Sequence, residues 1–404
     1  MRRWYTYTVV LIAVIICLSG CVKSTSVKTV SSETSKAISL KQTDASSSEV
    51  PEENDTLTIC MVGDVLLHDP LEAAAQDKDG NYNYDFLFEH LKGRISGNDL
   101  ALVNQEVIIG GKELGVSGYP NFNASFEIAD SLARAGFDIV CHATNHVLDK
   151  GSRGVKNALE YWEKNHPEIE VTGIHDSNED QARISVVEKC GIKVAILNYT
   201  YGTNGIAIPS DMPYAVDLLE EKRVREDLKK AETLADFTIV CPHWGTEYSL
   251  DVDASQKKWT KLFREGGADL VLGTHPHVIE GIEEIQDNDR AHWTNNHGNG
   301  DMLVYYSLGN FANWTSGTGA GVANRMVGGM AEITLTRTPN GEVAISDHEI
   351  LPIVCHVSDD PNEISVYPLN EYTPELGQQN AIRKQDATFS TEYCRELCKK
   401  IWGM

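Results

Sequence analysis

Basic residues are scarce in this chain. Its 404 residues include 35 Lys and Arg against 59 Asp and Glu, which gives a formal net charge of −24 at pH 7. Binding to nucleic-acid phosphates requires clustered Lys and Arg, so this balance argues against a nucleic-acid partner. Any other anionic partner would require a local exception, such as bound cations.

Long apolar runs are also lacking. The longest N-terminal run, at 9–17, is shorter than the roughly 20 residues that span a bilayer. It follows Arg2 and Arg3 and precedes Leu-Ser-Gly-Cys, which resembles a bacterial lipobox with cleavage before Cys21 and lipidation of its thiol. A plain transmembrane anchor is the alternative. We expect residues 1–21 to be a lipoprotein signal peptide, and the protein to be extracytoplasmic and lipid-anchored to the bacterial cell membrane.

Residues 22–55 lack apolar periodicity. They are rich in Ser, Thr, Lys and Glu, and such a segment buries too little apolar area to offset its chain entropy. We therefore expect a disordered stalk between the membrane and the folded domain.

Cysteine is sparse and absent from the polar motifs described below. Seven cysteines follow the lipobox, an odd number for an exported protein. Cys60, Cys141 and Cys241 lie inside apolar runs and are expected to be packed thiols. Cys394 and Cys398 are four residues apart on a predicted helix, a spacing that is poor for a disulfide.

From residue 57 onward, short apolar runs alternate with stretches of helical spacing, which predicts an α/β layered domain. The strand candidates are almost entirely apolar, as is typical of strands buried on both faces. They are 57–62, 100–103, 138–141, 193–197, 237–241, 270–272 and 303–306. The helix candidates are 126–135, 152–164, 217–235 and 255–265, with Gly136 and Gly266 as stops and Asp217 or Ser255 as N-caps.

The pattern changes near the C-terminus. Residues 330–336 and 342–350 alternate with a period of two across Pro-Asn-Gly, which predicts a hairpin that closes the domain. We place the folded domain at 56–356 and a polar tail at 357–404, ending in an amphipathic helix at 391–402. Residues 286–300 are expected to form an exposed loop.

Six polar motifs stand where apolar runs end. They are GDVLLH at 63–68, NQE at 104–106, TNHVLD at 144–149, HWGTE at 243–247, THPH at 274–277 and SLGN at 307–310. In an open α/β sheet the carboxyl ends of the strands face a common crevice, so residues distant in sequence can converge there. The motifs predict one metal site assembled from many strand ends.

The acidic and amide residues of these motifs have chemical alternatives. Asp64 can reach a cation or can be a turn residue or helix cap. Glu106 can bridge two cations or be a solvated acid, and Asn104 can orient it or contact substrate. Asn145 offers a ligand oxygen, while His146 can move a proton. Asp149 can hold the His146 ring in one tautomer or cap the next helix.

The histidines give the strongest signal. His275 and His277, separated by one residue, can ligate the same cation as neutral imidazoles, together with His243. A lone histidine would more often be a satisfied core residue. Mixed oxygen and nitrogen ligands suit Mn, Zn or Fe better than Ca, and we expect one or two such ions.

Together these motifs resemble the CapA family, bacterial proteins of poly-γ-glutamate capsule synthesis with a calcineurin-like, metallophosphoesterase-type domain. The resemblance covers about 56–312 and implies a four-layer α/β sandwich with two central mixed sheets and the site at their edge. On that template His146 is the proton donor, Asp149 its partner, and Asn104, Glu247 and Asn310 line the pocket. The implied metal ligands are Asp64, Glu106, Asn145, His243, His275 and His277.

Some positions depart from the pattern. Thr144 and Gln105 replace a common Asn and Leu without touching a ligand. Metallophosphoesterases carry Asp-x-His in the first motif, but Leu66 occupies that position here and the nearest histidine is His68. Glu106 stands where those enzymes have aspartate. The two-metal site can therefore be incomplete.

Three functions follow. The first is an accessory in poly-γ-glutamate or capsule assembly or export, whose partners are an anionic polymer or capsule synthase components. The second is a metal-dependent phosphoesterase or other hydrolase acting on a cell-envelope substrate, so enzymatic activity stays open. The third, a solute-binding lipoprotein with a vestigial site, leaves the six motifs unexplained.

Overall fold

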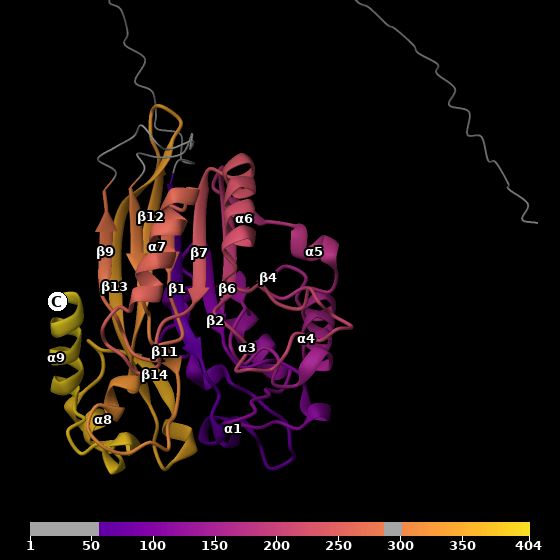
Figure 1. The fold of residues 1–404 in the computed structure, drawn as a ribbon. Coiled ribbons are helices and arrows are strands. Elements are labelled where there is room, and N and C mark those ends of the chain that lie inside the picture. Colours follow the sequence, from indigo (N-terminus) through magenta and orange to yellow (C-terminus); the bar gives the residue numbers. More distant parts are fainter. Residues whose placement is uncertain (1–55, 287–300) are drawn as a thin grey trace, which may run out of the picture. The chain divides into compact units, whose positions relative to one another are not determined.

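The computed structural model describes residues 56–286 and 301–404 (Figure 1). The expected signal peptide, Cys21, the stalk and nearly all of the 286–300 loop lie outside the described residues. Within the described ranges, none of the helices has both the length and the apolar character needed to cross a membrane.

The first sheet combines parallel and antiparallel strands. Its order is β14-β13-β12-β1-β2-β3-β4, and β11 also pairs with β1 in parallel. The parallel half consists of β1 (Thr56–Val65), β2 (Leu100–Gln105), β3 (Ile139–Cys141) and β4 (Glu170–Thr172). The antiparallel half consists of β12 (Val327–Arg337), β13 (Val343–His356) and β14 (Ser365–Pro368), and β11 is Asn310–Ala312.

The second sheet is also mixed. Its order is β5-β6-β7-β8-β10-β9, with a parallel centre and antiparallel strands at both edges. The strands are β5 (Ser185–Lys189), β6 (Ile192–Thr200), β7 (Phe237–His243), β8 (Leu270–Leu272), β9 (Ile282–Ile285) and β10 (Met302–Tyr305). Every predicted strand and the predicted hairpin are present, whereas the short strands β4, β5, β9, β11 and β14 were not predicted.

Three apolar cores separate four layers. Alternate residues of β1 face opposite sides of the first sheet, as the period of two requires. Ile59 and Met61 point to a core shared with the second sheet, including Val194 and Ile239. Val62 lies in the core beneath the helices of the first sheet. A third core joins the second sheet to its own helices. The predicted four-layer sandwich with two mixed sheets is confirmed.

Helices cover the two outer faces. Those in the core of the first sheet include α1 (Asp69–Ala75), α2 (Lys92–Ile95), α3 (Glu127–Ala135) and α4 (Gly151–Asn165). On the second sheet, α6 (Glu221–Leu234) and α7 (Ala254–Gly266) contribute residues such as Leu228 and Phe263. A further short helix, α5, spans Asn178–Ala182.

The helix ends correct three predictions. Ser255 is not the N-cap of α7, because Asp253 forms a capping box with Gln256 one turn further on. Asp217 is not the N-cap of α6, which follows Glu220, and its carboxylate instead bonds to His175. Gly136 ends α3 in the left-handed conformation as predicted, but Gly267 rather than Gly266 does so for α7.

The segment after His356 packs into the core of the first sheet. It contributes β14, α8 (Pro374–Gln379) and the predicted terminal helix α9 (Thr391–Trp402), coloured yellow in Figure 1. Cys394, Leu397 and Cys398 are buried there, and the indole Nε1 of Trp402 donates to the Glu280 carbonyl at 2.9 Å. Residues 357–404 thus share a core with the domain that precedes them.

Candidate metal centre

The carboxyl ends of β1, β2, β3, β7, β8 and β10 bring the six motifs together at one edge of the two sheets. At the end of β1, the Asp64 amide donates to the Gly309 carbonyl at 3.0 Å. A Cβ atom at Gly63 would lie only 1.9 Å from that carbonyl oxygen, so glycine is required for this approach. The resulting register sets Asp64 beside Asn310 of β11.

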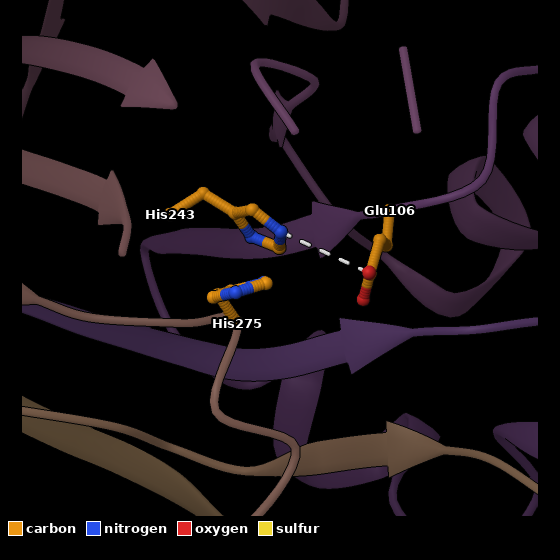
Figure 2. A group of neighbouring side chains, drawn as sticks. All are labelled: Glu106, His243 and His275. Atoms are coloured by element: carbon orange, nitrogen blue, oxygen red, sulfur yellow. Dashed lines mark ion pairs between the residues drawn. The ribbon is translucent and has the colours of Figure 1, made fainter. Parts of the chain in front are cut away.

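Glu106 faces the imidazoles of His243 and His275 (Figure 2). Its Oε1 is 3.8 Å from Nε2 of His243 and 3.6 Å from Nε2 of His277. Both carboxylate oxygens are buried and accept no hydrogen bond from the described residues. Burial is the main reason that the pKa of Glu106 is raised well above its usual value. Because an unpaired buried carboxylate is costly, these oxygens fit a cation.

The first candidate ligand group contains Glu106, His243 and His275, whose ligand atoms lie within 4.8 Å of one another. Oδ1 of Asn145 is 3.0 Å from Nε2 of His243 and adds a fourth donor. Nδ1 of His243 lies 3.0 Å from the Thr274 hydroxyl. When Nδ1 donates to that hydroxyl, the Nε2 lone pair faces the oxygens of Asn145 and Glu106, an arrangement suited to a metal ion.

The second candidate group contains Asp64, Glu106 and His277. Nδ1 of His277 lies 3.2 Å from Oδ2 of Asp64. Burial acts to lower the pKa of His277, but the carboxylates of Glu106 and Asp64 outweigh it and raise the pKa to about 9. Glu106 belongs to both groups and can therefore bridge two ions. A third combination joins Glu247 to His275 and His277.

The loop that carries two of these imidazoles is held in an unusual conformation. His275 has a φ of 98° and His277 a φ of 59°, both in the left-handed region that non-glycine residues rarely adopt. Such backbone costs on the order of 1–3 kcal/mol per residue and tends to occur at functional sites. The His275 amide donates to Oδ2 of Asp64 at 3.2 Å, which fixes the loop to β1.

The imidazoles of the first group are suited to ligation. Burial lowers the pKa of His243 and of His275 well below the usual value, and neighbouring histidines lower both further. Nδ1 of His275 is buried without a hydrogen-bond partner among the described residues. Both rings are thus kept neutral, which is the form that binds metal.

His146 and Asp149 form a pair beside the ligand groups. Nδ1 of His146 lies 2.7 Å from Oδ2 of Asp149, which also accepts from the Phe122 amide at 2.7 Å. The ring of Phe122 packs edge-on against His146, with centroids 4.6 Å apart. Lys150 occupies the N-cap position of α4 without a capping hydrogen bond, and Asp149 orients the His146 ring instead of capping the helix.

The remaining predicted residues occupy two kinds of position. Asn104 and Asn310 are buried and hold the ligands: Nδ2 of Asn104 donates to Asp64 at 2.8 Å, and Oδ1 of Asn310 is 3.0 Å from Nδ1 of His277. Glu247 is exposed and lines an adjoining cavity. All predicted site residues within the described ranges gather at this edge, while Cys21 lies outside those ranges.

The first motif has Leu66 where metallophosphoesterases carry a histidine, and the structure shows where Leu66 and the nearest histidine lie. Leu66 is buried at the cavity wall. His68 also lines the cavity, and its ring packs edge-on against Phe122 at 5.1 Å. None of the three ligand groups among the described residues includes His68. Burial lowers the pKa of His68 to about 4.

Two connected cavities open beside the ligand groups. The larger holds about 510 Å³ and is lined by His146, Asp149, Asn204 and Glu247; the smaller holds about 200 Å³ and is lined by Thr315 and Arg325. Tyr248 and His277 belong to both walls. Sequence reasoning missed Tyr248, Asn204 and Arg325, because no strand-end motif includes them, although Tyr248 directly follows HWGTE. Tyr248 and Asn204 lie in turns, and Arg325 lies in the short 3-10 helix Val322–Met326.

Comparison with known proteins places this site in a family context. The family model described as bacterial capsule synthesis protein PGA_cap matches residues 58–315. The chain is 26% identical over 276 residues to the capsule biosynthesis protein CapA of Bacillus anthracis, covering 65% of this chain and 62% of that protein. It is 25% identical over 274 residues to the PGA biosynthesis protein CapA of Bacillus subtilis (strain 168), covering 65% of each. The match thus spans less than two thirds of either relative.

Among solved structures, the chain is similar to a 5′-nucleotidase precursor from Thermus thermophilus. The TM-score is 0.44 at 15% identity, and the match covers 86% of this chain and 58% of that one.

Proposed function

The chain belongs to the bacterial capsule synthesis protein PGA_cap family, and on this premise we propose that it acts in poly-γ-glutamate or capsule biosynthesis or export through the metal centre. The two CapA relatives support this role by their names. We further propose that it works outside the cytoplasm, tethered through a lipid on Cys21, beside capsule synthase components.

One observation carries the metal part of the proposal: the carboxylate of Glu106 is buried without hydrogen-bond donors among the described residues and faces His243, His275 and His277. We propose that Mn, Zn or Fe is bound by Glu106, Asn145, His243 and His275. A second ion would be bound by Asp64, Glu106 and His277, that is, by three protein ligands instead of four. The first position should therefore bind more tightly.

A cation at this edge also accounts for how an acidic chain can engage an acidic polymer. The formal net charge of −24 repels a polyanion at long range, although screening limits this to about 8 Å at physiological ionic strength. Bound divalent cations reverse the local sign where the polymer would make contact. Polymer binding should consequently depend on the metal.

A metal-dependent phosphoesterase or hydrolase acting on an envelope substrate is the alternative, favoured by the His146–Asp149 pair in the cavity wall. A cation held by the ligand groups would polarise the substrate and activate a water. Asp149 accepts a hydrogen bond from Nδ1 of His146, and the imidazolium form of this residue would pass its Nε2 proton to the departing oxygen. Asn104 and Asn310 keep Asp64 and His277 in position.

The test measures polymer binding and turnover in one preparation of the full chain. The metal content is determined first, and poly-γ-glutamate binding is then measured with and without chelator. Stoichiometric metal with chelator-sensitive polymer binding and no hydrolysis supports the accessory role. Hydrolysis of a phosphodiester such as bis(p-nitrophenyl) phosphate, without polymer binding, supports the alternative. Chelator-insensitive binding of the polymer contradicts the metal-dependent role.

A further inference from the structure

The smaller cavity is lined by His277 but not by His146. Its walls include His68, Trp314, Thr315 and Arg325, none of which belongs to a candidate ligand group. Because the two cavities share Tyr248 and His277, a substrate group at the metal centre can continue into either one. The two cavities thus adjoin each other beside His277, a candidate ligand.

Arg325 supplies a fixed positive charge in this smaller cavity. Its Nη1 donates to the Thr315 hydroxyl at 2.8 Å, and its guanidinium carbon lies 3.4 Å from the ring centroid of Tyr248. Stacking on an aromatic face holds the planar guanidinium in one orientation. Thr315 is held in turn, since its carbonyl accepts from Nε2 of Gln385 at 3.1 Å.

The guanidinium of Arg325 has an N–H donor without an acceptor among the described residues. Within the described residues, its buried Nε has no hydrogen-bond partner, and no carboxylate lies within 4.0 Å of the guanidinium. The chain has many more acidic than basic residues, 59 against 35, yet the Arg325 side chain forms no ion pair with the described ones. A buried donor without an acceptor is costly, and a ligand oxygen would relieve that cost.

The backbone of Arg325 is coupled to the metal centre. Its carbonyl accepts from Nδ2 of Asn310 at 2.9 Å, and Oδ1 of the same asparagine contacts Nδ1 of His277. The Asn310 side chain therefore links His277, a candidate ligand, to the backbone of Arg325. That coupling is suited to a substrate whose two groups must be held at a fixed separation.

We propose that Arg325 is a specificity-determining residue that binds an oxyanion group of the substrate, next to the group held at the metal centre. The occupant is a carboxylate or a phosphate, which the guanidinium fork binds in the same way. The inference rests on the proposed function for the location of the reacting group. It adds a requirement: the substrate carries a second negative charge beside that group.

The test compares Arg325→Gln with Arg325→Lys and with Arg395→Gln, a matched loss of one exposed charge on α9. Two probes are titrated into each metal-loaded full chain: a short γ-glutamyl oligomer for the carboxylate and inorganic phosphate for the phosphate. Metal content and melting temperature are measured alongside, to separate lost binding from lost folding. Arg325→Gln should weaken binding about tenfold or more, as expected for one charged hydrogen bond.

Arg325→Lys should recover only part of the affinity, because an ammonium keeps the charge but not the planar fork. If Arg325→Gln loses affinity for the oligomer but not for phosphate, the site binds carboxylates. If it loses affinity for phosphate but not for the oligomer, the site binds phosphates, and support for the polymer role is removed. Unchanged affinity for both probes in folded, metal-loaded Arg325→Gln overturns the inference and leaves the proposed function standing. Wild-type protein that binds neither probe overturns both.

Discussion

Asp64 and Asn310 are neighbours across the parallel pairing of β1 with β11, and both reach Nδ1 of His277, at 3.2 Å and 3.0 Å. The residues come from the first and the last of the six motifs, and the imidazole comes from the fifth. A strand of only three residues, β11, makes this possible, since it continues the parallel register beside the end of β1.

We predict that Glu106→Gln loses both metal ions, whereas His277→Ala loses one. Glu106 belongs to both ligand groups, and the neutral amide replaces an anionic oxygen that each ion needs. His277 is absent from the group formed by Glu106, His243 and His275. Metal analysis of the purified full chains gives the stoichiometry, with His90→Ala as a surface control. Glu106→Gln protein that retains its full metal content would disprove the shared role.

His146→Ala should lower turnover at least about 100-fold, if the protein is a hydrolase, while leaving the metal content unchanged. The reason is that His146 lines the cavity but belongs to none of the ligand groups among the described residues. Asp149→Asn should lower turnover less, since the imidazole remains but its tautomer is no longer fixed. Initial rates with bis(p-nitrophenyl) phosphate and parallel metal analysis check this. A variant that keeps wild-type turnover removes His146 from the mechanism.

Gly63→Ala should destabilise the fold by at least about 2 kcal/mol and weaken metal binding. The added Cβ would lie 1.9 Å from the Gly309 carbonyl oxygen, and backbone cannot yield as a flexible side chain can. The displacement would separate Asp64 from Asn310. Gly93→Ala is the control, since nothing lies within 4 Å of its Cβ and it sits in helix α2, where alanine is favoured. Denaturant unfolding with equal stability for the two variants would contradict the prediction.

His175 predicts a pH-dependent contribution to stability. Burial acts to lower its pKa, but its bonds to Asp180 and Asp217, at 3.1 Å and 2.7 Å, outweigh burial and raise the pKa to about 9. Arg223 also faces this group, 3.5 Å from Asp217. Because the folded-state pKa exceeds the unfolded value of 6.5, the stabilisation is fully present below that pH and is lost as the pH rises through about 9.

The measurement compares the free energies of unfolding of wild type and His175→Gln, from denaturant titrations between pH 6 and pH 10. The difference should be largest at pH 6, on the order of 2–3 kcal/mol, and should shrink toward pH 10. His90→Gln, on the surface, serves as the matched control. A difference that stays constant over this range would show that the two carboxylates do not hold a charged imidazole.

The long and central strands could be predicted from the sequence, because short runs that are almost entirely apolar are typical of strands buried on both faces. Strands such as β7, buried along its whole length, are unmistakable. β11 has three residues, Asn310–Ala312, and its pairing depends on β1, so no local pattern marks it. The helix caps show the same limit. Asp253 and Ser255 are both acceptable N-caps by residue type, and the reciprocal bond to Gln256 decides between them.

The amino-acid sequence by itself determined which residues gather at the candidate site. The carboxyl ends of parallel strands converge at one edge of a sheet, so the correct placement of the strands was enough to predict that Glu106 and His275 lie close together. Only the tertiary structure decided that, within the part of the chain it describes, the Glu106 carboxylate has no hydrogen-bond donor, and that Arg325 shares a cavity with His277 while its buried Nε has no acceptor. Burial and pairing depend on every neighbouring segment in three dimensions. Arg325 lies in a 3-10 helix of only five residues, Val322–Met326, which is too short for a periodic pattern that would reveal its neighbours.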